Sequence, residues 1–87
     1  MGDECLRPKP YPDPYLRGME LLGLQPEHTI VLEDSPAGIK AAVAAGVHAV
    51  IGLTTGHKAE TLMEAGATVA VADFFGVLDL IAQHQAQ

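Results

Sequence analysis

The sequence of 87 residues has no tryptophan, one cysteine and five basic residues against eleven acidic ones. The lone cysteine, Cys5, has no partner for an internal disulfide or a thiolate-rich metal site, which fits a reducing compartment. A net charge of −6 with scattered cations disfavours sequence-independent binding of nucleic acids. The apolar runs are far shorter than the ~18 residues of a membrane-spanning helix. We therefore expect an intracellular protein, in the cytoplasm or an organelle, with no nucleic-acid or membrane partner.

The residues that are present predict one small packed unit. Hydrophobic residues make up 48% of the chain and the mean hydropathy is +0.19, which disfavours intrinsic disorder. Alternating prolines within residues 1–12 predict an extended lead-in, because each ring fixes φ and restricts the residue before it. Residues 13–84 are expected to alternate helices with strands, and residues 85–87 to form a short tail.

The helices and strands can be placed from their start and stop signals. Asp13 and Pro14 predict an N-cap and a first helical residue, and Gly23 can end that helix. Residues 29–32 are a short apolar run rich in β-branched side chains, which predicts a central parallel strand covered on both faces. The later elements are expected as a helix that starts at Ser35-Pro36, covers 39–45 and ends at Gly46, a strand at 47–53, a helix at about 58–65, a strand at 68–72 and a helix from 74 or 75 to about 84.

The order of these elements predicts the fold class. Strands that alternate with helices favour parallel pairing, right-handed crossovers and helices on both faces of the sheet. The expected fold is therefore α/β, a Rossmann-like three-layer arrangement around a parallel sheet. In such folds ligands bind beyond the carboxyl ends of the strands.

Two acidic residues, Glu33 and Asp34, follow the first predicted strand at that edge. Backbone N–H groups at the start of the next helix favour ionised carboxylates. Carboxylate oxygens suit Mg²⁺, which takes one or two of them together with waters and substrate phosphate. The alternative is that Asp34 and Ser35 only cap the helix while Glu33 points to solvent.

Lys9 is a second candidate, because it stands between Pro8 and Pro10. A stiffened backbone suits a lysine that must position its charge against a phosphate, although an ordinary solvated lysine in a turn is the alternative. The Lys9-Pro10 bond can be cis or trans, and the sequence does not decide between them. Thr54 and Thr55, after the second predicted strand, could line the same edge or form a polar turn.

Lys9 and Glu33-Asp34 are separated by one helix and one strand, so both could reach one sheet edge. Around them the sequence resembles the haloacid dehalogenase superfamily, in particular the C-terminal half of its phosphatase and β-phosphoglucomutase-like branch. The resemblance extends over roughly residues 4–73, and residues 52–56 look most like plant-type members. The matching tracts are specific in order and spacing: Lys9-Pro10-Tyr11-Pro12-Asp13-Pro14-Tyr15-Leu16, Leu22-Gly23, Val31-Leu32-Glu33-Asp34-Ser35-Pro36-Ala37-Gly38-Ile39-Lys40-Ala41-Ala42 and Ala44-Ala45-Gly46.

This resemblance implies roles for the candidate residues. Lys9 matches the lysine that holds the nucleophile and the transferring phosphoryl group. Glu33 and Asp34 match the acidic residues that hold Mg²⁺ directly or through water. The implied activity is Mg²⁺-dependent hydrolysis of a small phosphorylated metabolite, sugar phosphates among them, through an aspartyl-phosphate. Ser35, Thr54 and Thr55 are further candidates to line the site.

The first motif of that family, DxDG[TV], has no match. No two of the chain's five aspartates lie two residues apart: Asp3, Asp13, Asp34, Asp73 and Asp79. The family's second motif and its helical cap domain should precede Lys9 and have no match either. We therefore expect the C-terminal half of a core domain, as a fragment, an abbreviated gene model or a degenerate product that is inactive alone. By the family's sheet order, the strand at 29–32 would then have a bare edge through which the chain could self-associate.

Two other interpretations stay open. A non-catalytic product of the same fold could bind a metal or phosphate, or act as an interaction fragment. A receiver-type signalling domain also ends its strands in acids, but it would place a lysine after its phosphoacceptor aspartate, and here the lysine comes first. Among the remaining residues, the four histidines are expected at or near the surface, Asp73 as an N-cap, and Phe74 and Phe75 in the core.

Overall fold

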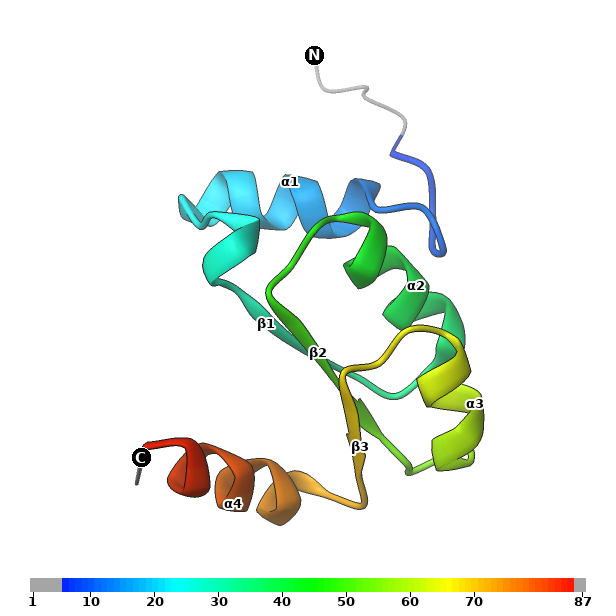
Figure 1. Cartoon of the computed structure of the whole chain (residues 1–87). Coiled ribbons are helices and arrows are strands. Elements are labelled where there is room, and N and C mark those ends of the chain that lie inside the picture. Colours follow the sequence, from blue (N-terminus) through cyan, green and yellow to red (C-terminus); the bar gives the residue numbers. More distant parts are fainter. Residues whose placement is uncertain (1–5, 86–87) are drawn as a thin grey trace.

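The computed structural model describes residues 6–85 as three short strands and four helices (Figure 1). The prediction for Cys5 and most of the predicted tail at 85–87 lie outside these residues. Within the described range, no helix combines the length and the apolar character needed to cross a membrane.

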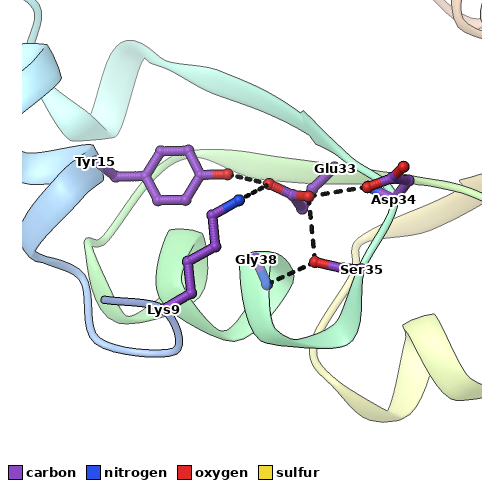
Figure 2. Close-up of polar contacts among 6 residues, drawn as sticks. All are labelled: Lys9, Tyr15, Glu33, Asp34, Ser35 and Gly38. Carbon is purple, nitrogen blue, oxygen red and sulfur yellow. Dashed lines mark hydrogen bonds and ion pairs between the residues drawn. The ribbon is translucent and has the colours of Figure 1, made fainter. Parts of the chain in front are cut away.

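The lead-in forms a turn before the first helix. The Tyr11 N–H donates to the Pro8 carbonyl oxygen at 3.0 Å, and the Lys9-Pro10 bond is cis. The prediction of an extended segment is therefore wrong for residues 8–11, because this hydrogen bond closes the chain on itself. The turn directs Lys9 back toward the sheet (Figure 2).

Helix α1 (Asp13–Leu22) begins one residue earlier than predicted. Its N-cap is Pro12, and Asp13 is the first helical residue rather than the cap. The Asp13 carboxylate instead accepts three hydrogen bonds from Arg7, at 3.0 to 3.2 Å, which removes it from the helix end. Gly23 ends the helix as predicted, with φ of 73°, a left-handed conformation that costs glycine little.

A 3₁₀ turn (Pro26–His28) leads into strand β1 (Ile30–Glu33), and helix α2 (Pro36–Ala44) follows after two residues. The Ser35 hydroxyl oxygen caps α2 by accepting the Gly38 N–H at 3.1 Å, as the sequence predicts. Short connections of this kind leave little freedom in how the end of β1 meets the start of α2.

The rest of the chain repeats the alternation. Strand β2 (Ala49–Leu53), helix α3 (Ala59–Glu64), strand β3 (Val69–Val71) and helix α4 (Phe74–Gln85) follow in that order. Asp73 is confirmed as an N-cap, since its carboxylate accepts the Gly76 N–H at 3.0 Å.

The sheet is parallel, with strand order β1-β2-β3, and the α/β prediction is confirmed. The core lies between the sheet and the helices α2 and α3, where Ile39, Val50 and Leu62 are the largest fully buried side chains. Helix α4 lies on the opposite face, where Gly76 packs against Val71 (Figure 1). The chain therefore has three layers, and the second helical layer, α4, covers the sheet only at β3.

Two burial predictions are wrong on that second face. Among the described residues β1 is an edge strand, and its Ile30 and Leu32 side chains are 53% and 41% exposed, because no helix covers them. Phe74 and Phe75 are 59% and 77% exposed rather than buried, since α4 presents Val77 to the sheet instead.

Candidate functional site

Four segments bring polar side chains together at the carboxyl end of β1 (Figure 2). Glu33 is the last residue of β1, and Asp34 and Ser35 connect it to α2. Lys9 arrives from the lead-in turn, and Tyr15 comes from the first turn of α1. This arrangement confirms the expectation that Lys9 and Glu33 reach one sheet edge.

The Glu33 carboxylate is the centre of the cluster and both of its oxygens are occupied. Oε2 accepts hydrogen bonds from the Lys9 ammonium at 3.2 Å and from the Tyr15 hydroxyl. Oε1 accepts the Asp34 backbone N–H at 3.1 Å and the Ser35 hydroxyl at 3.3 Å. The side chain of Glu33 is only 10% exposed, whereas that of Lys9 is 43% exposed. The idea that Glu33 points to solvent is therefore wrong.

Gly38 makes room for this carboxylate in the first turn of α2. A Cβ atom at position 38 would overlap the carboxyl group of Glu33. The backbone conformation of Gly38 is an ordinary one, so space rather than backbone freedom explains the glycine. Ser35 and Gly38 thus serve both the helix cap and the position of Glu33.

The contacts of Glu33 change the acidity of two groups. Partial burial raises the pKa of Glu33, but the hydrogen bonds from Tyr15 and Lys9 outweigh burial and hold the pKa below its ordinary value. Burial raises the pKa of Tyr15 well above its ordinary value, and the hydrogen bond to the Glu33 carboxylate raises it further. At neutral pH the cluster is therefore a carboxylate bound by a neutral phenol and an ammonium group.

Asp34 differs from its neighbour. It is exposed, and within residues 6–85 no hydrogen bond or ion pair to its carboxylate is found. The described residues hold no group of three or more His, Cys, Asp or Glu side chains that could enclose a metal ion. Mg²⁺ needs only one or two protein carboxylates when waters and a phosphate complete its shell. Asp34 fits that requirement as a direct ligand, whereas the four hydrogen bonds that Glu33 accepts leave its oxygens no lone pair for a metal-bound water.

Among the described residues, Thr54 and Thr55 make no hydrogen bond to this cluster. The Thr54 N–H donates to the Val71 carbonyl oxygen at 2.9 Å, and its hydroxyl donates to the same oxygen at 3.4 Å, which ties Thr54 to β3. Thr55 lies exposed in the turn that follows β2. The surface position predicted for the histidines is confirmed for His28, His48 and His57, and the side chain of His84 lies outside the described part.

Surface hollows also lie elsewhere. One, of about 700 Å³, opens beside α1, and another, of about 330 Å³, lies between α2 and α3. Neither includes Lys9, Glu33 or Asp34 in its lining. These two hollows are therefore separate from the cluster around Glu33.

Tyr15 and Gly38 are the site residues that sequence reasoning missed. From the sequence, Tyr15 was noted only within the tract that resembles the family, but a phenol that packs against a core needs a partner for its hydroxyl group. Its position six residues after Lys9, in the first turn of the next helix, is the signal that could have found it. Gly38 carries no signal beyond its presence in the first turn of a helix, where glycine is unfavourable.

Known proteins share this sequence and this fold. Residues 1–53 match the family described as haloacid dehalogenase-like hydrolase. Validoxylamine A 7'-phosphate phosphatase from Streptomyces hygroscopicus subsp. limoneus is 49% identical over 64 residues, which cover 74% of this chain and 30% of that protein. Hexitol phosphatase A from Escherichia coli K12 is 52% identical over 49 residues, which cover 56% of this chain and 23% of that protein.

A solved structure agrees. A haloacid dehalogenase family hydrolase from Deinococcus radiodurans R1, with bound phosphate and sodium, matches with a TM-score of 0.78 and 34% identity over 88% of this chain and 35% of its own. The chain therefore spans about a quarter to a third of the length of these relatives. Both the sequence match and the fold lead to one conclusion: the chain belongs to the haloacid dehalogenase-like hydrolases.

Proposed function

We propose that the chain carries the lysine and carboxylate part of a Mg²⁺-dependent site for phosphate-ester hydrolysis, and that the isolated 87 residues have no turnover. One observation carries this proposal. The Lys9 ammonium lies 3.2 Å from the Glu33 carboxylate at the carboxyl end of β1, and the exposed Asp34 is the next residue along the chain. A cation and an available carboxylate at one sheet edge suit a phosphate group and its metal ion.

Each residue has a separate role in this proposal. Mg²⁺ supplies charge neutralisation at the phosphoryl oxygens when it is bound. Asp34 would hold the ion directly. Glu33 would keep Lys9 in place instead, because its two oxygens already accept four hydrogen bonds and have no lone pair left for a metal-bound water. Lys9 would bind and orient the anionic phosphoryl group with the exposed part of its side chain.

The missing component is the attacking group. The family chemistry implied by the sequence uses the first aspartate of a DxDG[TV] motif, and this sequence contains no such motif. Glu33 cannot replace it, since a carboxylate that accepts four hydrogen bonds is a poor nucleophile. Asp34 is the other carboxylate at the carboxyl end of β1, and its proposed role is to bind the metal.

The names of the relatives support a substrate class for this proposal. Two of them are phosphatases whose names specify validoxylamine A 7'-phosphate and a hexitol, and one solved structure contains bound phosphate. We extend this to a small phosphorylated metabolite with several hydroxyl groups, such as a sugar or polyol phosphate. The residues of this site would contact the phosphate group of such a molecule.

A turnover assay tests the proposed lack of activity. The purified chain and its Asp34→Asn variant are incubated with general phosphate esters and excess Mg²⁺. We expect neither to release phosphate above the buffer control. Metal-dependent turnover that survives purification and disappears in Asp34→Asn would contradict the proposed lack of a nucleophile.

Calorimetric titration with Mg²⁺ tests the proposed metal site. Binding should be weak, since waters must fill most of the metal's coordination positions, and Asp34→Ala should abolish it. Asp79→Ala is the matched control, because it removes an exposed aspartate on α4, away from the cluster. Equal binding in the wild type and Asp34→Ala would remove Asp34 from the metal site.

A second candidate is a non-catalytic interaction fragment. It is favoured by the exposure of Ile30 and Leu32 on the edge strand. The two candidates are compatible, since the polar cluster and this apolar stretch occupy different parts of β1.

A further inference from the structure

The outer edge of β1 is the feature that the proposed function leaves unused. Within residues 6–85 the only strand that pairs with β1 is β2, along residues 30–33. An edge strand leaves about half of its backbone N–H and C=O groups without a strand partner, and these groups can pair with another chain. Proteins often protect such edges with lysine, proline or a bulge. Residues 29–32, Thr-Ile-Val-Leu, contain no lysine or proline, and the register of residues 30–33 with β2 is uninterrupted.

The side chains of β1 differ between its two faces. Val31 points to the helical core and is 9% exposed, which fixes the orientation of the strand. Ile30 and Leu32 point to the opposite face and are about half exposed. Their exposed area lies directly beside the unpaired edge, so a strand added there could cover both.

We propose that two copies of this chain associate through β1, whose edges pair in antiparallel register around a two-fold axis at Val31. Opposed residues in such a pair share a face of the sheet. With Val31 opposite Val31, Ile30 of each copy lies opposite Leu32 of the other. The four exposed side chains then form one apolar patch, and the two three-stranded sheets become one of six strands.

The charges along β1 fit a second copy of the same strand. Glu33 is the only charged residue from 29 to 33, and Lys9 neutralises it within its own chain at 3.2 Å. In the proposed register Glu33 lies opposite Thr29, and the exposed Asp34 lies toward the exposed His28 of the second copy. No two like charges oppose each other. The net charge of −6 opposes association, but charges beyond ~8 Å are screened at physiological salt.

Sedimentation at increasing protein concentration, in metal-free buffer, tests this inference independently of the proposed function. The wild-type mass should rise from one chain to two. Leu32→Lys should weaken association at least tenfold, because it places a cation in the apolar patch. Phe75→Lys is the matched control: it removes an equally apolar and more exposed side chain from α4 and should leave association unchanged. Each variant is first checked for native circular dichroism.

If Leu32→Lys does not fold, hydrogen exchange of the wild type tests the inference without that variant. Protection of the amides of residues 30 and 32 should increase with concentration while that of Leu62 stays constant. Three results would overturn the inference: a wild type that remains monomeric at all concentrations, association that Phe75→Lys abolishes but Leu32→Lys does not, or association without added protection at 30 and 32.

Discussion

The two regions of β1 satisfy their polar groups in opposite ways. At its carboxyl end, Glu33 accepts four hydrogen bonds from Lys9, Tyr15, Asp34 and Ser35, all within the chain. One residue earlier, Leu32 lies on an unpaired edge with its side chain 41% exposed. Within the described residues, both oxygens of the Glu33 carboxylate have hydrogen-bond donors, whereas the outer edge of β1 at Leu32 has no strand partner.

This difference shows that a site can be preorganised on a sheet whose edge is still open. The cluster depends on local connections, because two residues join β1 to α2 and the lead-in turn adjoins α1. Covering Ile30 and Leu32 requires a strand or helix that the described chain does not provide. Site geometry and sheet completion are therefore separable properties of this protein.

The largest difference in stability is expected between two leucine truncations on opposite sides of the sheet. Leu62→Ala should lower the free energy of unfolding by about 2–5 kcal/mol, because it leaves a cavity in the core. Leu32→Ala should cost less than about 1 kcal/mol at low protein concentration, because its side chain is already half exposed. Urea unfolding measures both. Equal losses would mean that the second face is covered in solution.

A smaller effect is expected where Glu33 needs space. Gly38→Ala should lower the free energy of unfolding by about 1–3 kcal/mol, since the new methyl group overlaps the Glu33 carboxyl group. Gly18→Ala is the matched control, because Gly18 lies within α1 and a Cβ there meets nothing within 4 Å. That variant should stabilise the protein by about 0.5–1 kcal/mol through helix propensity. Stabilisation by both substitutions would show that Glu33 does not occupy this position.

The ionisation of Glu33 should make stability depend on pH in acid. Its pKa is lower in the folded chain than the ordinary value of 4.5, so the unfolded chain takes up the proton first as pH falls. The contribution is therefore complete above pH 4.5 and is lost as pH falls through the folded pKa. Glu33→Gln should lower stability at pH 7 by about 1 kcal/mol and flatten this acid dependence.

Asp13 must be separated from this effect, because the hydrogen bond from Arg7 also lowers its pKa. Asp13→Asn removes that group and should leave the Glu33 part of the acid dependence intact. Urea unfolding between pH 2.5 and 7 compares the three proteins. If Asp13→Asn abolished the acid dependence and Glu33→Gln preserved it, the dependence would come from Asp13 and not from Glu33.

The smallest effect concerns Tyr15. Burial and the hydrogen bond to Glu33 raise its pKa, so its phenolate should form well above pH 10. Tyr11→Phe leaves Tyr15 as the sole tyrosine, and its ultraviolet absorbance can then be titrated directly. Adding Glu33→Gln to Tyr11→Phe should move the midpoint back toward 10. An ordinary midpoint in the chain that keeps Glu33 would separate Tyr15 from the cluster.

Much of the fold was predictable from sequence because its signals are local. Helix α2 has a serine cap before a proline and a glycine after its end, and all three occur where expected. The α/β order also followed from apolar runs between such signals. The N-cap of α1 was not predictable from a local rule, because Arg7 takes the carboxylate of Asp13 from outside the helix.

The site was predictable in its charged residues but not in its arrangement. Lys9, Glu33 and Asp34 follow from position and from the family resemblance. The distinct states of Glu33 and Asp34 depend on which carboxylate meets Tyr15, a contact between residues 18 positions apart. Burial of Phe74 and Phe75 was wrongly predicted because hydrophobicity alone does not show which face of a helix meets the sheet.

The most direct test of the account follows the two adjacent carboxylates separately. In carbon-13 NMR of side-chain carboxyl groups, Mg²⁺ is titrated into the wild-type chain at pH 7. We predict that the Asp34 carboxyl signal shifts with metal concentration, while that of Glu33 moves little because its hydrogen bonds persist. A large shift at Glu33 with none at Asp34 would contradict the account, since it would make Glu33 the ligand and its four contacts dispensable.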